Sequence, residues 1–122
     1  MNEPLNLVLF IWQGQTFNDQ LTWKDSAGAP VDLTGYTVQM MARKDIADAA
    51  PQFTWSDTTG EIVLGGAAGT VTFNVSSAAT FALQSSLETV QWVYDMLFTA
   101  PSGLADRLIQ GSIVIRPGVT RP

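Results

Sequence analysis

The sequence predicts an all-β fold: an antiparallel β-sandwich of about seven to eight strands with one short helix, or alternatively a small β-barrel. Apolar and polar residues alternate along most of the chain, which is typical of half-buried strands. Turn residues separate these segments at intervals of roughly 8–15 residues. With 122 residues, we expect one domain spanning 1–122, with a short N-terminal arm (1–4) and a C-terminal tail (117–122).

The first strand is expected at Leu5–Trp12, which is apolar throughout and therefore predicts a buried strand. The flank before it holds Glu3 and no Lys or Arg, unlike a signal peptide. We therefore expect the chain to stay in the cytoplasm of the cell that makes it, or to leave without a cleavable signal. A second strand is expected at Thr16–Lys24, whose apolar face carries Phe17, Leu21 and Trp23.

The segment Pro30–Thr37 predicts a connector that starts a new strand. Pro30 fixes its φ, and Gly35 permits a positive φ. The side chains of Asp32 and Thr34 can hydrogen-bond to the nearby backbone. The strand that follows is expected at Tyr36–Lys44, with one face formed by Tyr36, Val38, Met40 and Ala42.

The second half of the chain predicts further strands and the one helix. The helix is expected at Ser76–Leu83, capped by Ser76 or Ser77. We expect strands at Phe53–Trp55, Glu61–Leu64, Thr70–Val75, Val90–Thr99 and Asp106–Arg116. The last two predict a hairpin, in which Gly111 leaves room for Trp92 on the neighbouring strand. The same face of the final strand is expected to hold Arg107, Ile109, Ile113 and Ile115.

Composition and charge argue against several classes of function. A net charge of −5 argues against binding nucleic acid, which requires a basic surface. The chain has no Cys and no His, so thiolate metal sites, the usual zinc sites and a Ser–His–Asp triad are excluded. No apolar segment reaches the roughly 18 residues of a membrane helix, and we expect no membrane insertion. Charged residues are 14% of the chain, which suits either a surface packed against neighbours or a neutral polar surface.

The remaining candidate sites are better explained as loops and turns than as metal, catalytic or phosphate-binding sites. Asp57 and Glu61 flank a glycine turn, and two carboxylates do not specify a calcium site. Asp45 and Asp48 are expected in a solvated loop. The run Gly65–Gly69 lacks the Lys-Ser/Thr of a phosphate loop. We expect no enzyme activity, metal or cofactor.

The four tryptophans divide into two pairs. Trp23 and Trp92 lie on apolar strand faces and are assigned to the core. Trp12 and Trp55 are the candidates for an interface anchor, because Trp is enriched at binding hot spots. A platform that stacks on a glycan is the alternative for the same two residues.

Several segments of the chain match a known pattern. The more specific part lies in the first half, in Trp12–Phe17, Leu21–Asp25, Gly28, Pro30–Val38, Met40 and Arg43. The more generic second half contributes Gly65–Val75, Tyr94-Asp95 and Arg107–Gly111. With these segments, most of the chain resembles the phage baseplate upper protein-type domains. Gln15 stands where the family usually has Asp, which we interpret as a neutral surface change.

The resemblance implies a structural virion protein of a tailed bacteriophage, made in the cytoplasm of the host bacterium. It implies an adaptor at the tail tip, baseplate or fibre-attachment region that contacts other phage structural proteins, and it implies no catalytic residues. A trimer or hexamer follows from phage architecture alone. The larger baseplate proteins continue into a stalk or receptor-binding module, and because this chain ends at Pro122 we expect the assembly domain alone.

Two alternatives remain open at this point: a head decoration or head–tail connector protein, and a receptor- or carbohydrate-binding module. The expected interface residues come from the two terminal arms and from the two tryptophans that are candidates for an interface anchor. They are Asn2, Glu3, Pro4, Trp12, Trp55, Val119 and Arg121.

Overall fold

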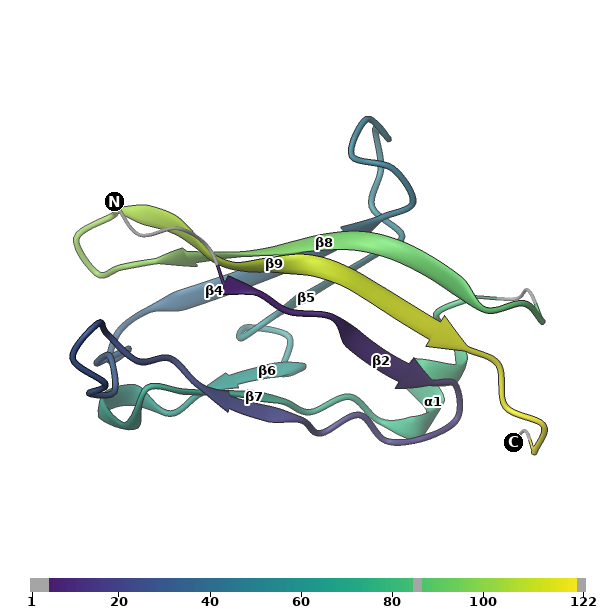
Figure 1. Ribbon diagram of the computed structural model, residues 1–122, viewed down its shortest axis with the longest axis horizontal. Coiled ribbons are helices and arrows are strands. Elements are labelled where there is room, and N and C mark those ends of the chain that lie inside the picture. The colour runs from purple at the N-terminus through teal and green to yellow at the C-terminus, as the bar shows by residue number, and fades with distance from the viewer. Residues whose placement is uncertain (1–4, 85–86, 121–122) are drawn as a thin grey trace.

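The computed structural model describes residues 5–84 and 87–120 and is dominated by strands (Figure 1). Its strands are β1 (Leu5–Asn6), β2 (Leu9–Trp12), β3 (Gln20–Thr22), β4 (Thr37–Arg43), β5 (Phe53–Ser56), β6 (Ile62–Leu64), β7 (Thr70–Phe73), β8 (Val90–Thr99) and β9 (Ala105–Arg116). A 3-10 turn, η1 (Gly66–Ala68), precedes β7, and the helix α1 (Ser77–Phe81) follows it.

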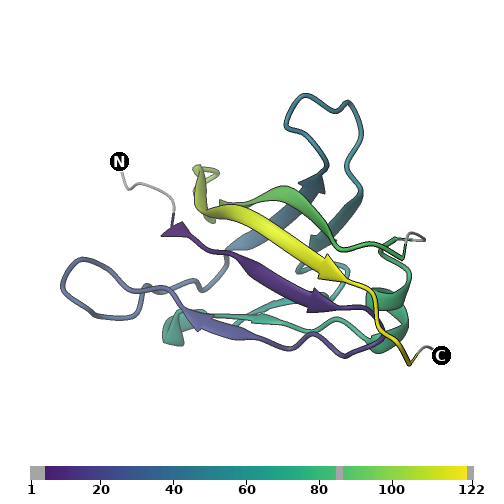
Figure 2. The ribbon, with the colours of Figure 1, turned by 45° about the vertical axis from the view of Figure 1, so that its right-hand side comes forward.

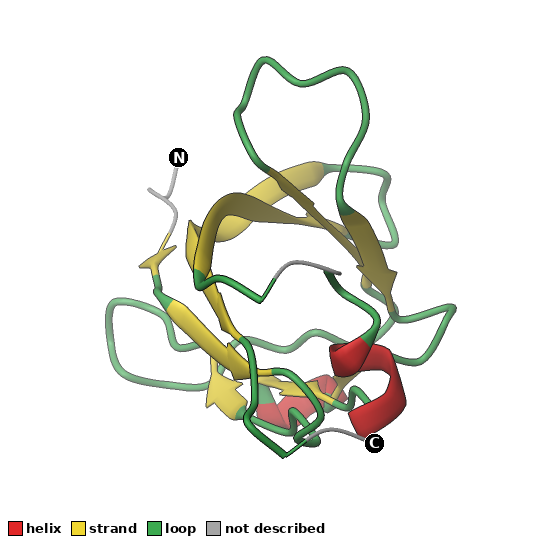
Figure 3. Cartoon of the chain, turned by 90° about the vertical axis from the view of Figure 1, so that its right-hand side faces the viewer, coloured by secondary structure: helices red, strands yellow, loops and turns green. Residues whose placement is uncertain are grey.

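The strands of the described residues form two sheets that pack face to face. The larger sheet has the order β1-β9-β8-β4-β5, and β2 also pairs with β9. The smaller sheet has the order β3-β7-β6. The larger sheet curls around the core like half of a barrel (Figure 3). The prediction of an all-β fold with one short helix is therefore confirmed, and the curl gives the sandwich some barrel character.

The N-terminal edge of the larger sheet departs from the predicted antiparallel arrangement. Both β1 and β2 run parallel to β9, with Leu5 opposite Ile109 and Leu9 opposite Ile113. They are two parts of one edge strand, interrupted at Leu7 and Val8. The prediction of a fully buried strand is also wrong, because burial alternates along β2. Both faces of Leu5–Trp12 carry apolar residues, so the sequence shows no alternation of apolar and polar residues by which an edge strand could be recognised.

A β-bulge in β9 changes which side chains face the core. Met96 pairs with Ile109, but the next residue, Leu97, pairs with Arg107, so Leu108 is the extra residue. Leu108 and Ile109 are both buried, whereas Arg107 is moved to the outer face, where Nε donates to Oδ2 of Asp95 at 2.7 Å. The prediction that Arg107 shares a face with Ile109 is therefore wrong, since a strict two-residue period does not continue through a bulge.

The predicted connector before β4 has the expected local structure. Oδ1 of Asp32 accepts hydrogen bonds from the hydroxyl of Thr34 at 2.6 Å and from its backbone N–H at 2.9 Å. These two bonds lower the pKa of Asp32, the side-chain bond contributing more. Gly35 has φ 78°. Leu33, which lies between Asp32 and Thr34 in the sequence, is buried in the core. The connector therefore holds Leu33 inward while the chain turns into β4.

The end of β2 is tied to the helix on the smaller-sheet side. The side-chain amide of Gln13 donates to the carbonyl oxygens of Phe81 (2.9 Å) and Gln84 (3.0 Å). The hydroxyl of Thr80 accepts from the N–H of Gly14 and donates to the carbonyl of Gln15. Helix α1 begins after Ser76, whose side chain accepts from the N–H of Ala79, as a helix N-cap does. These contacts hold the direction of β2 as it leaves the sheet.

An aromatic cluster joins the two sheets in the core. The ring of Trp55 on β5 lies 4.3 Å from that of Phe53 and 6.1 Å from those of Phe17 and Phe73, which belong to the smaller-sheet side. Trp55 is 4% exposed. Trp92 is also buried, so its assignment to the core is confirmed. Trp23 is half-buried and packs against the same core.

The role of Gly111 differs from the predicted one. Its partner across the hairpin is Tyr94, not Trp92, and a Cβ at Gly111 would overlap the carbonyl oxygen of Leu7. The Tyr94 hydroxyl donates to that same oxygen at 2.6 Å. Burial raises the pKa of the Tyr94 hydroxyl, so the group stays protonated as a donor. Gly111 therefore lets the N-terminal edge strand approach β9 closely.

Candidate interaction surface

An exposed apolar feature of the described residues lies along β2 and the residue just before it. Val8, Phe10 and Trp12 point away from the core and are 50%, 55% and 49% exposed, whereas the intervening Leu9 and Ile11 are buried. We call these three side chains the β2 stripe. Scattered apolar side chains are normal on protein surfaces, but consecutive outward positions on one strand form a continuous patch, which marks a candidate contact site.

A cation packs against this stripe. The guanidinium carbon of Arg116 on β9 lies 5.4 Å from the ring centre of Trp12 and 6.0 Å from that of Phe10. Trp12 lies directly opposite Arg116 in the parallel register. No carboxylate of the described residues forms an ion pair with Arg116. Such cation–π contacts contribute about 0.5–1 kcal/mol at exposed sites.

The backbone edge of β2 is open. Leu7 and Gln13 direct their N–H groups to β9, at Gln110 and Arg116. The pleat then directs the N–H and C=O groups of Phe10 away from β9, and within the described residues β2 pairs with no strand on that side. Figure 2 shows β2 at the front edge of the larger sheet, beside β9. An unpaired edge of this kind can accept another strand.

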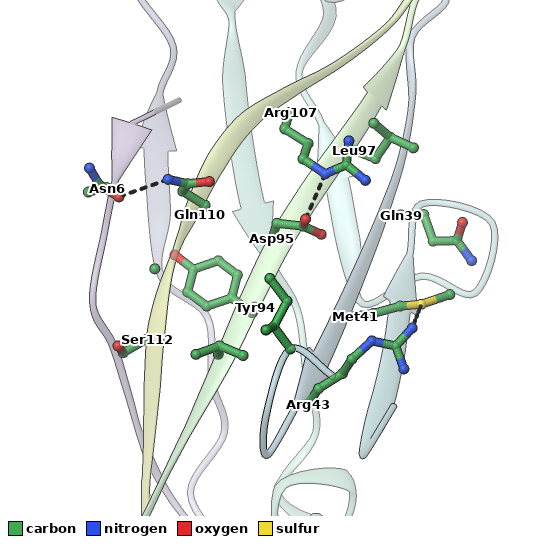
Figure 4. A pocket seen from close by; sticks show the side chains of 13 residues that line it. Asn6, Gln39, Met41, Arg43, Tyr94, Asp95, Leu97, Arg107, Gln110 and Ser112 are labelled. Carbon is green, nitrogen blue, oxygen red and sulfur yellow. Dashed lines mark hydrogen bonds and ion pairs between the residues drawn. The ribbon is translucent and has the colours of Figure 1, made fainter. Parts of the chain in front are cut away.

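A second feature is a groove of about 810 Å³ on the outer face of the same sheet (Figure 4). Its floor includes Met41 and Leu97. The ion pair of Asp95 and Arg107 lies on one side, and Arg43, which donates to the Met41 sulfur, lies on the other (Figure 4). Ile46, in the loop between β4 and β5, also lines the groove and is 86% exposed. The groove is lined by both apolar and polar side chains.

Several polar side chains of this groove hydrogen-bond to neighbouring side chains. Asn6 accepts from Gln110, and Ser112 accepts from Gln91. Side chains in the Asp95–Arg107 pair are 41% and 59% exposed, so solvent screens the pair. Among the described residues, the groove thus presents no set of polar groups that converge on one point.

The carboxylates considered in the sequence lie in turns. Glu61 accepts hydrogen bonds from the Thr59 hydroxyl and the Ser56 N–H, and Asp57 accepts from the N–H of Val38. Asp45 and Asp48 close the loop after β4. In the part of the chain that the structure describes, no group of three or more His, Cys, Asp or Glu residues is placed to hold a metal ion. No described helix is long and apolar enough to cross a membrane.

The predicted interface residues are dispersed by the fold. Trp12 lies in the β2 stripe, and Val119 is 96% exposed after the last strand. Trp55 is a correction: it is a core residue, because its outward neighbours Thr54 and Ser56 leave it on the inner face of β5. Asn2, Glu3, Pro4 and Arg121 lie outside the described residues.

Sequence reasoning missed Val8, Phe10 and Arg116. The first two were hidden in a run of apolar residues that is equally typical of a buried strand. Arg116 carried no signal of its own, since its position over the rings depends on the parallel register with β9. The run from Leu5 to Asn18, which contains no charged residue, was the one unusual feature of the sequence at this candidate surface.

The fold and the surface define the chain as a small β-sandwich module with an apolar open edge. Comparison with known proteins adds no family: no family model and no curated protein matches the chain.

Proposed function

We propose that this protein is a structural component of a tailed bacteriophage particle that works through protein–protein contacts, as an adaptor in the tail-tip, baseplate or fibre-attachment region. The observation that carries the contact role is the open edge of β2, lined by Val8, Phe10 and Trp12. Soluble proteins ordinarily protect such an edge with charge, proline or a covering loop. An adaptor needs an edge of this kind available for a neighbour.

The location in a phage tail is supported by the sequence resemblance. The residues that carry it have structural roles in this fold: Gln13 and Gly14 tie the end of β2 to α1, and Asp32 with Thr34 forms the connector before β4. The residues that carry the resemblance are thus residues that shape this domain. The partners on this proposal are other virion proteins and further copies of the chain, without nucleic acid.

Particles released by the cells that encode the chain provide the test. We expect the protein to copurify with intact particles in a density gradient, and a gold-labelled antibody to mark the tail end. Labelling of the head would favour the decoration or connector alternative instead. A protein that stays entirely in the soluble fraction while particles form would overturn the proposal.

A second candidate function is supported by the exposure of Phe10 and Trp12, since aromatic rings on a surface can stack on sugars. Arg116 already lies against both rings, so a glycan would have to displace the guanidinium or share the rings with it. Trp12→Ala separates the two functions. Loss of adsorption to host cells with normal particle assembly would favour glycan binding, and loss of incorporation would favour the adaptor.

A further inference from the structure

Four strand edges of the described sheets are free, and they differ in charge. The edges at β3, β5 and β6 each have acidic residues at or beside their ends: Asp19 precedes β3, Asp57 follows β5 and Glu61 precedes β6. The edge at β2 has none, because no charged residue occurs from Leu5 to Asn18. In a chain with a net charge of −5, this is the edge where two copies can meet without bringing acidic groups together.

We propose that the free edge of β2 pairs antiparallel with the same edge of a second copy of this chain, about a two-fold axis at Phe10. Identical strands that pair antiparallel form such a self-complementary contact. In this register Phe10 faces Phe10 of the second copy, and Val8 faces Trp12. In this register each side chain of the β2 stripe lies opposite a stripe side chain of the second copy.

The backbone of β2 fits this pairing. The N–H and C=O groups of Phe10 point away from β9, so two copies exchange both hydrogen bonds at Phe10. The carbonyl of Trp12 already accepts from the N–H of Gln15, which turns the chain away and ends the paired segment. The guanidinium of Arg116 lies against the rings of Phe10 and Trp12, on the face of the sheet that these side chains occupy.

This contact specifies how copies of the chain would associate in the proposed function. It rests on that function only because copies of the chain must meet. A two-fold pair gives a dimer, or one of the contacts in a hexamer of dihedral symmetry. A trimer with threefold symmetry alone does not contain it. Because the paired segment is short, we expect a weak contact that is strengthened when many copies are held in one assembly.

Single cysteines test the register, because the chain contains no cysteine of its own. In the proposed pair the two copies of residue 10 have Cα atoms about 5.5 Å apart, within the range that a disulfide spans. The two copies of residue 8 lie about 14 Å apart along the strands, beyond that range. Phe10→Cys is therefore expected to form a disulfide-linked dimer under mild oxidation.

Two matched controls keep this test specific. Val8→Cys has similar exposure on the same edge, and Val63→Cys has similar exposure on β6 of the other sheet. We expect each alone to cross-link at least tenfold less than Phe10→Cys. A mixture of Val8→Cys and Trp12→Cys proteins is expected to give the mixed dimer, identified by mass spectrometry. Equal cross-linking of Val8→Cys and Phe10→Cys would overturn the register.

Phe10→Lys tests the contact without cross-linking. A lysine at an edge strand disfavours pairing with another strand, because it brings a charge into the contact. Self-association measured by light scattering should therefore weaken at least tenfold in Phe10→Lys, whereas Val63→Lys should leave it unchanged. Circular dichroism checks that both variants are folded. Wild-type protein that does not associate at any concentration, or that associates equally well as Phe10→Lys, would overturn this inference. Incorporation into phage particles is a separate readout, so the proposed function can stand when this contact fails.

Discussion

The Tyr94 hydroxyl donates a 2.6 Å hydrogen bond to the carbonyl oxygen of Leu7, a residue 87 positions earlier in the chain. The bond passes over Gly111, where the absence of a side chain leaves room for the backbone of Leu7. Leu7 lies where the edge strand is interrupted between β1 and β2. One side chain of β8 thereby fixes the N-terminal strand against β9 and sets the position of the open edge.

Removing the hydroxyl tests this role. Tyr94→Phe keeps the ring in the core but removes the donor, and we expect a loss of about 0.5–1.5 kcal/mol in unfolding free energy. Amide exchange should quicken most at Leu9 and Ile11, whose N–H groups face β9. Uniform acceleration across the core strands would instead mean that the bond does not hold this strand in particular.

The close approach at Gly111 gives a second prediction. Gly111→Ala places a methyl group against the Leu7 carbonyl and adds backbone strain, because φ is 152°. We expect a loss of about 1–3 kcal/mol in chemical denaturation. Gly103→Ala, at a turn glycine whose added Cβ meets no atom within 4 Å, is the control for strain without a clash. Equal losses for the two variants would contradict the close approach.

Substitutions at Trp55 and Trp12 should have opposite effects on stability and on self-association. Trp55→Ala opens a cavity in the aromatic cluster and is expected to cost about 3–5 kcal/mol in unfolding free energy. Trp12→Ala, at a residue that is 49% exposed, should cost less than about 1.5 kcal/mol while weakening self-association. Denaturation followed by fluorescence measures the first effect, and light scattering the second. A large stability loss in Trp12→Ala would contradict its placement on the surface.

The hydrogen bonds of the connector before β4 predict that the stability of the fold depends on pH in the acidic range. The hydrogen bonds from Thr34 lower the pKa of Asp32 below its ordinary value of 3.8, so ionised Asp32 stabilises the folded state. This contribution is present above pH 3.8 and is lost as the pH falls through the folded pKa. The stability difference between wild type and Asp32→Asn should therefore shrink on acidification. A difference that stays constant from neutral to acidic pH would contradict the role of the charge.

Much of the fold was predictable because its strands obey a local rule. The faces of β4 and β8 follow the two-residue period, and Val38, Met40, Trp92 and Met96 are buried as that period requires. The turn and cap residues were equally local signals: Asp32 and Thr34 bond as expected, and Ser76 caps the helix. Such features depend on neighbouring residues alone.

The candidate surface depended on relationships that no local pattern contains. The parallel pairing of β2 with β9 joins the two ends of the chain, and it places Arg116 over Phe10 and Trp12. The bulge at Leu108 moves Arg107 outward to Asp95. Both follow from the packing of the whole sheet, so the sequence pattern assigned Arg107 to the wrong face and left Val8 and Phe10 of the β2 stripe undetected.

The most direct test of an assembly role is the molar mass of the purified protein in solution, measured by light scattering over a wide range of concentration. A mass that rises above the 13.2 kDa of one chain as the concentration increases is the predicted result. A mass that stays at 13.2 kDa up to millimolar concentration would contradict association of copies through the open edge of β2.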